Sequence, residues 1–139
     1  MSQHSESEIL PTIIVSKAEY QVLTGLVEAV EERLPEIASV LQAEMDRAEV
    51  VAEEAVPADV VRMGSTVEFQ QDGGQPRTVT LVFPGDADIS EGRISILTPI
   101  GTALIGLSPG QSIAWTARDG RRQRLTVLKV EQTAASAPA

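Results

Sequence analysis

The 139 residues suffice for one compact hydrophobic core and are too few for two full-sized domains. Because 42% of them are apolar but only 3% are aromatic, we expect a core of Val, Leu, Ile and Ala without a deep aromatic pocket. The chain has no cysteine and a single histidine, His4, which excludes disulfides, thiolate metal sites, and cysteine or Ser-His catalysis.

The excess negative charge lies in the first half of the chain. Residues 1–64 carry 13 Asp and Glu against 4 Lys and Arg, which accounts for the whole net charge of −9, whereas residues 65–139 carry seven of each. An acidic surface repels phosphates, so we expect a cationic protein partner rather than direct nucleic-acid binding. The sequence shows neither a signal-peptide pattern nor a run of about 18 apolar residues, which predicts a cytoplasmic protein without membrane contact.

Residues 11–56 are predicted to form a short antiparallel helical hairpin, preceded by a disordered polar leader at residues 1–10. Ser16 and Glu19 form a capping-box signature that starts the first helix, and Pro35 ends it and starts the second. Each arm has roughly 15 residues, or about 22 Å at 1.5 Å per residue. Apolar residues recur at helical spacing along both arms: Leu23, Leu26, Val27, Val30 and Leu34, then Ile37, Leu41, Met45 and Ala48.

Residues 57–131 are predicted to form an antiparallel sheet with one short helix, which makes the fold class α+β. A polar turn at residues 71–76 and an Asp119-Gly120 turn separate neighbouring strands. The helix is expected from Pro99 to Ile105, and residues 132–139 are expected to be a disordered tail. The five expected strands cover residues 67–69, 78–83, 93–96, 113–117 and 123–130.

Three polar or turn segments are candidate sites. Asp86 and Asp88 could hold a hard cation, although two carboxylates alone make a poor cage, and an acidic patch facing a partner or solvent is favoured. The helix that begins at Pro99 is predicted to be amphipathic and to pack on the core. The free backbone amides of its first turn could also bind a partner. The last turn carries four arginines that could meet phosphates, but a charged, solvated turn is favoured: Arg118, Arg121, Arg122 and Arg124.

The run from Gly85 to Gly106, followed by Pro109–Ile113 and Leu125–Glu131, resembles the carboxy-terminal domain of the Gre transcript-cleavage factors. The resemblance implies an FKBP-like fold that binds RNA polymerase at the rim of its secondary channel, on the largest subunit. It also implies a set of partner-binding residues on the acidic loop and the following turn: Asp86, Asp88, Thr98, Pro99, Ile100 and Gly101.

The amino-terminal half departs from the Gre factors and resembles the Rnk proteins, regulators of nucleoside diphosphate kinase. The tip, Val30–Glu36, does not match the acidic Gre tip, and the arms are short, whereas Pro11–Val15, Leu41–Ala48 and Pro57–Ser65 match the Rnk pattern. The resemblance implies a monomeric, bacterial, non-enzymatic transcription regulator that needs no cofactor and does not cut RNA. Any effect on nucleoside diphosphate kinase would then be indirect.

Two alternative functions remain open from the sequence. A Gre-type cleavage and elongation factor would deliver acidic residues and magnesium to the polymerase active site from the tip of its coiled coil. A peptidyl-prolyl isomerase is suggested by the FKBP-like fold alone, and it would need an aromatic proline pocket that four scattered rings do not readily supply.

Overall fold

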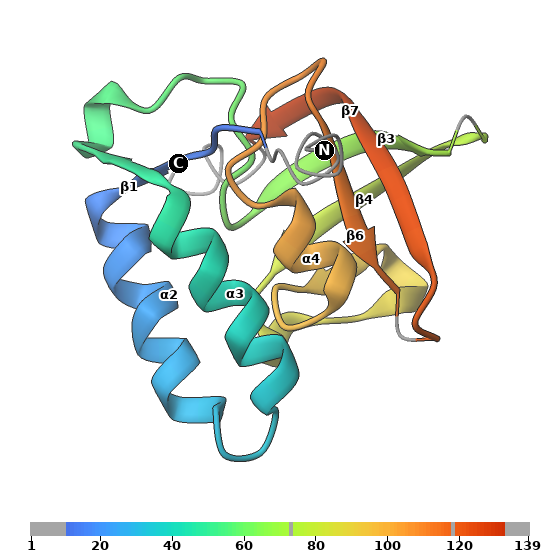
Figure 1. Cartoon of the computed structure of the whole chain (residues 1–139). Coiled ribbons are helices and arrows are strands. Elements are labelled where there is room, and N and C mark those ends of the chain that lie inside the picture. Colours follow the sequence, from blue (N-terminus) through green and yellow to red (C-terminus); the bar gives the residue numbers. More distant parts are fainter. Residues whose placement is uncertain (1–10, 73, 118, 133–139) are drawn as a thin grey trace, which may run out of the picture.

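A computed structural model describes residues 11–72, 74–117 and 119–132 of the chain. The predicted leader, residues 1–10, lies outside this range, as do residues 133–139 of the predicted tail and Arg118. The structure is α+β, as predicted: two helices precede a mostly antiparallel sheet that carries one short helix (Figure 1). Within the part of the chain that the structure describes, no helix has the length and apolar character needed to span a bilayer.

The helices α2 (Lys17–Val30) and α3 (Pro35–Arg47) lie side by side, and we call them the helix pair (Figure 1). Ser16 caps α2 as predicted, because its Oγ accepts a hydrogen bond from the Glu19 N–H at 3.0 Å. Pro35 opens α3, where its missing N–H costs nothing. The predicted first helix was four residues too long, because α2 ends at Val30, and Leu34 is the N-cap of α3 and is 39% exposed.

The chain enters and leaves the helix pair through two short parallel strands, β1 (Ile14–Ser16) and β2 (Glu49–Val51). The sequence analysis did not predict β2, although Val50 and Val51 are β-branched residues that favour strands. A 3₁₀ turn, η1 (Glu53–Ala55), follows β2. The two strands therefore close the base of the helix pair.

The main sheet has the strand order β5-β4-β3-β7-β6. All neighbouring strands run antiparallel except β4 and β5, which are parallel, so the prediction of a wholly antiparallel sheet was wrong for β5. The chain reverses direction through two 3₁₀ turns before entering β5. The elements of this half are β3 (Ser65–Gln71), β4 (Pro76–Val82), η2 (Pro84–Asp86), η3 (Ile89–Glu91), β5 (Arg93–Ser95), α4 (Pro99–Leu104), β6 (Ser112–Thr116) and β7 (Arg122–Gln132).

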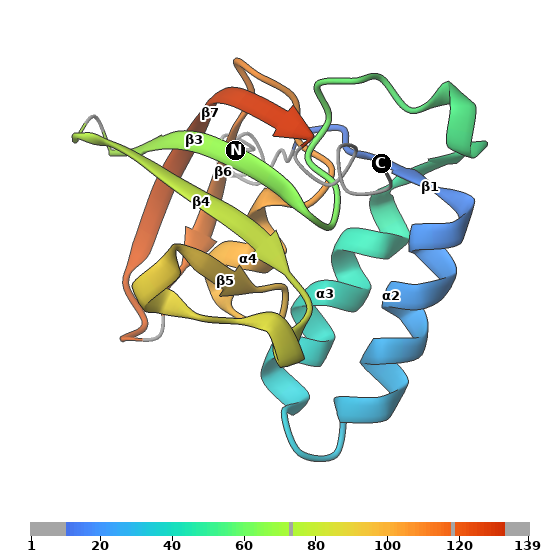
Figure 2. The ribbon, with the colours of Figure 1, turned by 180° about the vertical axis from the view of Figure 1, so that it is seen from behind.

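The buried apolar side chains of the helix pair and of the sheet form one hydrophobic cluster. Helix α3 lies between α2 and α4, and α4 packs behind the sheet as seen in Figure 2. Phe69 is the largest side chain in this core and is fully buried, with aliphatic residues around it. The last residue of β7, Gln132, was assigned to the tail by sequence, but its amide group binds Ser65 Oγ and the carbonyl oxygen of Val60.

Candidate functional site

The acidic loop between β4 and β5 is organised by Asp88 and Arg93. The backbones of these two residues exchange hydrogen bonds of 2.9 Å in both directions. Asp88 Oδ1 also accepts from the N–H and the hydroxyl of Ser90, at 3.1 and 2.6 Å, and so caps η3. Gly92 closes the turn with a φ of 76°, a conformation that glycine adopts without strain.

The two predicted carboxylates of this loop have different roles. The hydrogen bonds from Ser90, together with the positive charge of Arg93, hold the pKa of the Asp88 carboxyl below its ordinary value. The Asp86 side chain is exposed, and the backbone carbonyl oxygen of Asp86 accepts a hydrogen bond from Arg93 Nε at 3.1 Å. Across the described ranges, no group of three His, Cys, Asp or Glu side chains is placed to hold a metal ion.

Ile89 is the residue of this loop that the sequence analysis missed. Its side chain is 85% exposed, the highest value among the exposed large hydrophobic residues of the described chain. In the sequence it lies between the acidic residues Asp88 and Glu91. The backbone groups of this loop are hydrogen-bonded to one another. The loop therefore presents a highly exposed apolar side chain close in sequence to two acidic residues.

The turn at the start of α4 holds the other four predicted residues. Thr98 caps the helix: its Oγ1 accepts from the Gly101 N–H at 3.1 Å and donates to the Ser95 carbonyl at 2.7 Å. Gly101 is buried, and a Cβ there would lie 2.2 Å from the Ser95 carbonyl oxygen, so only glycine fits. Pro99 and Ile100 are half-buried and keep an accessible surface.

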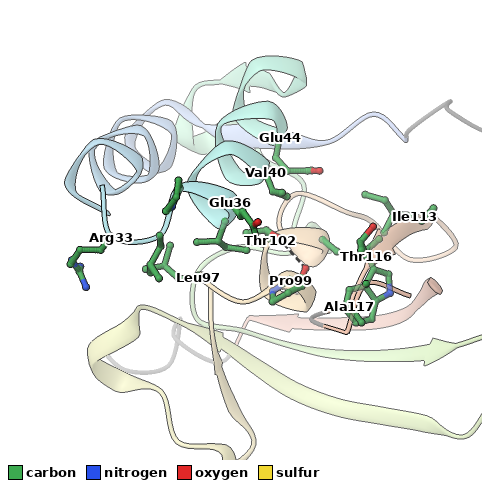
Figure 3. Close-up of a pocket in the computed structure, with 17 residues that line it drawn as sticks. Arg33, Glu36, Val40, Glu44, Leu97, Pro99, Thr102, Ile113, Thr116 and Ala117 are labelled. Carbon is green, nitrogen blue, oxygen red and sulfur yellow. Dashed lines mark hydrogen bonds between the residues drawn. The ribbon is translucent and has the colours of Figure 1, made fainter. Parts of the chain in front are cut away.

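A groove of about 840 Å³ lies between α3, from its start to Glu44, on one side and α4 and β6 on the other (Figure 3). Pro99 is the member of the predicted set that lines it. The other lining residues are mostly apolar and include Leu34, Ile37, Val40, Leu97, Ala103, Ile113, Ala114 and Trp115, together with Arg33, Glu36, Glu44, Thr102 and Thr116.

Two buried polar atoms of the groove-lining residues have no hydrogen-bond partner within the described chain. They are Glu44 Oε1 and Trp115 Nε1. Glu44 is 6% exposed, and its other carboxylate oxygen pairs with Arg47 at 2.9 Å. Burial raises the pKa of the Glu44 carboxyl, and the hydrogen bond from Arg47 opposes this rise. Sequence reasoning could not find this pair, because Glu44 occupies an ordinary polar position of a helix.

A second buried carboxylate ties the base of the helix pair to the sheet. Glu19 accepts a hydrogen bond from the Met63 N–H at 3.1 Å and faces Arg62 Nε at 3.5 Å. Its side chain therefore does not complete the predicted capping box but reaches the segment before β3. Burial raises the Glu19 pKa, and the Arg62 charge opposes it, while the hydrogen bond from Arg62 lowers the pKa of Glu53.

The arginines of the last turn stand in solvent. Arg121, Arg122 and Arg124 are exposed, and Arg118 lies outside the described residues. The Asp119 carboxylate accepts a hydrogen bond from the Arg121 N–H at 3.0 Å, and Gly120 has a φ of 85°. The predicted tight turn at Asp119-Gly120 is thus confirmed.

Comparison with known proteins first defines the class. The family described as "Transcription elongation factor, GreA/GreB, C-term" matches residues 56–132, and "Rnk N-terminus" matches residues 11–51. A solved "Prokaryotic transcription elongation factor GreA/GreB" from Nitrosomonas europaea has a TM-score of 0.69 and 38% identity, covering 86% of this chain and 98% of its own. The fold is therefore that of a GreA/GreB-like factor.

The family follows from the curated relatives. The "Regulator of nucleoside diphosphate kinase" of Escherichia coli strain K12 is 38% identical over 122 residues, which are 87% of this chain and 90% of the relative. The chain belongs to the Rnk family. The "Transcription elongation factor GreA" of Rhodospirillum rubrum is 36% identical over 106 residues, which are 76% of this chain and 65% of that protein.

Proposed function

We propose that this protein regulates transcription in the bacterial cytoplasm by binding RNA polymerase as a monomer, at the rim of the secondary channel on the largest subunit, without cutting the transcript. Residues 57–131 form the FKBP-like domain that docks in this proposal, and residues 11–56 form a short antiparallel coiled coil beside it. No cofactor takes part. The effect on nucleoside diphosphate kinase that the relatives' name describes is indirect, through transcription.

One observation carries the proposal: the tip of the helix pair and the start of α4 line the same groove. Leu34 and Glu36 contribute from the tip, and Pro99 contributes from the turn (Figure 3). A single partner surface can therefore touch the predicted docking turn and the acidic tip at once. This arrangement fits a regulator that binds at a channel mouth and occludes it.

The length and packing of the helix pair support occlusion rather than cleavage. At 1.5 Å per residue, the 14 residues of α2 span about 21 Å and the 13 of α3 about 20 Å. Helix α3 packs against α4 along part of its length, so the pair is held to the sheet domain, although its tip extends past α4 (Figure 1). Cleavage of the Gre type requires a longer coiled coil that carries its acidic tip to the polymerase active site.

The geometry also divides the predicted docking residues by role. Asp88, Thr98 and Gly101 shape the loop and the turn through hydrogen bonds or close packing. Asp86, Pro99 and Ile100 keep accessible surface, and Ile89 joins them. We infer that these four make the direct contacts, with the carboxylate of Asp86 facing a cationic partner.

The test is capture of purified RNA polymerase by the immobilised wild-type chain and by an Asp86→Arg, Pro99→Ala double variant. We expect at least about a tenfold loss of affinity, equivalent to about 1.4 kcal/mol. Glu28→Arg is the matched control, because it reverses a charge on an exposed position of α2. Equal capture of the double variant and the wild type would refute the docking surface, and shortened RNA in stalled polymerase complexes would establish the cleavage alternative.

A further inference from the structure

The strand β6 leaves one edge of its backbone unpaired. It is the terminal strand of the sheet and pairs with β7 on one side. The Ala117 N–H donates to the Arg121 carbonyl oxygen, and the Val127 N–H donates to the Gln111 carbonyl oxygen. With the register of this antiparallel ladder, the odd-numbered residues of β6 are therefore those whose backbone groups hydrogen-bond to β7. The N–H and C=O groups of Ala114 and Thr116 therefore point away from β7, and within the described ranges no residue hydrogen-bonds to them.

The groove meets this edge from the side. Five consecutive residues, from Ile113 to Ala117, line it. Successive side chains of a strand point to opposite faces of the sheet, so a groove that touched one face would be lined by alternate residues. Lining by every residue indicates that the groove runs along the strand edge, where the free backbone groups lie.

The opposite wall supplies apolar surface and negative charge. Leu34 and Val40 of the helix-pair tip and α3 are 39% and 46% exposed and line the groove. Glu36 lies on the same wall and is exposed, and Glu44, whose Oε2 pairs with Arg47 at 2.9 Å, keeps its buried Oε1 without a partner. Figure 3 shows Glu44 on the side of α3 that faces β6, whereas Arg33 stands at the far end of the groove and points away.

We propose that this groove binds an extended, basic peptide segment of a partner protein, which adds to β6 as a further strand. The free N–H and C=O groups of β6 recur every two residues, which matches the repeat of about 6.6 Å in an extended peptide backbone. A peptide bound as an α-helix could not pair with them, because its own backbone groups are already hydrogen-bonded within the helix. Small or β-branched side chains of the peptide pack between Val40 and α4, and a lysine or arginine faces Glu36 and Glu44. The inference does not require the partner to be RNA polymerase.

The test selects a displayed library of random ten-residue peptides against the immobilised full chain. Enriched peptides should be rich in β-branched residues with at least one Lys or Arg. The most enriched peptide is then synthesised with a fluorophore, and its binding to each protein variant is measured by fluorescence anisotropy.

Two variants address the two halves of the inference. Ala114→Pro removes an outward N–H while leaving the β6–β7 ladder intact, and it should weaken peptide binding at least about tenfold. Val40→Lys places a positive charge on the acidic wall and should weaken binding similarly. Val22→Lys is its matched control, because Val22 is also an exposed helix residue, at 51%, but does not line the groove; this variant should bind as the wild type does.

Each outcome decides the inference. Absence of any enriched peptide, or a peptide bound equally by the wild type and Val40→Lys, would overturn it. A peptide that binds as a helix, shown by a gain of helical circular dichroism in the complex, would also overturn it. Val40→Lys keeps the test decisive if Ala114→Pro does not fold, because Val40 is nearly half exposed.

Discussion

The base and the tip of the helix pair are held in opposite ways. At the base, β1 and β2 pair, the Ile14 N–H donates to the Gly106 carbonyl at 3.2 Å, and Glu19 reaches the Met63 N–H. At the tip, residues 31–36 are exposed, and the chain reverses through two hydrogen bonds to the Val30 carbonyl. The base therefore carries the tertiary contacts, and the tip keeps an accessible surface.

The difference shows that a short helix pair need not be a free arm. Its closed end is fixed by strands, a buried carboxylate and a close glycine contact, and α3 is held along α4. Substitutions should therefore become less damaging to the free energy of unfolding from the base toward the tip. Four substitutions test this gradient.

The largest effect is expected for Gly106→Ala at the base. Gly106 has a φ of 82°, and a Cβ there would lie 2.7 Å from Ile13 Cβ. Backbone strain and overpacking add, so the free energy of unfolding should fall by about 4 kcal/mol, measured by urea denaturation. Gly25→Ala is the control: it has open space inside α2 and should stabilise the protein by about 0.5 to 1 kcal/mol. If Gly106→Ala left the free energy of unfolding unchanged, the base would not be as tightly packed as described.

Arg62→Ala should cost less, about 2 kcal/mol. Arg62 contacts both Glu19 and Glu53, and its removal leaves the Glu19 carboxylate buried without a cation. The estimate is below that for a fully buried pair because 24% of the Arg62 side chain is exposed. Lys129→Ala, which breaks an exposed pair with Glu131, should leave the midpoint of urea unfolding unchanged. Equal losses of stability in the two variants would show that the ion pairs of Arg62 stabilise the protein no more than an exposed surface pair does.

The pH dependence of stability should identify Glu44, which lies about one turn from the base end of α3. Burial raises the Glu44 pKa above its ordinary value of 4.5, so the folded chain binds this proton more tightly than the unfolded chain. Its contribution to the free energy of unfolding is therefore fully present below pH 4.5 and is lost as pH rises through the raised pKa. Relative to Glu44→Gln, the wild type should gain stability as pH falls from 7 toward 4.5, in urea titrations at several pH values.

Asp88→Asn is the control of opposite sign for that titration. The Asp88 pKa is lowered from 3.8, so its contribution is present above pH 3.8 and is lost as pH falls through the lowered value. A wild-type curve parallel to that of Glu44→Gln above pH 4.5 would contradict the burial of Glu44.

The smallest effect is expected at the tip. Leu34→Ser should change the free energy of unfolding by less than about 0.5 kcal/mol, because Leu34 is 39% exposed and lies outside the hydrophobic cluster. Thermal unfolding followed by circular dichroism measures this. A loss of several degrees in Tm would show that the tip is packed and would weaken the contrast with the base.

Sequence reasoning located the elements well where local chemistry decides them. The α-helices of the described residues begin at Ser16, Pro35 and Thr98-Pro99, and Asp119-Gly120 makes the turn before β7. Each signal acts through neighbouring backbone groups, so it can be read from a few adjacent residues. The candidate site was found only in part: Asp86, Pro99 and Ile100 keep accessible surface, while Gly101 is enclosed by the Ser95 carbonyl.

Most features that sequence reasoning missed involve residues distant in the chain, and the end of the first helix is the local exception. Helical periodicity assigned Leu34 to a buried stripe, but the helix ended four residues earlier. The parallel pairing of β5 with β4 depends on how two 3₁₀ turns redirect the chain. Glu19 looked like half of a capping box, yet its carboxylate binds 44 residues away.

The sequence by itself determined the α+β class, the starts of the helices, most strand positions and the asymmetric charge, because propensity, capping and hydrophobic period are local properties. Only the tertiary structure decided that α3 lies against α4. The same holds for the groove along the free edge of β6 and for the exposure of Ile89. These depend on which surfaces meet when distant segments pack together, and burial of an individual side chain is settled only by that packing.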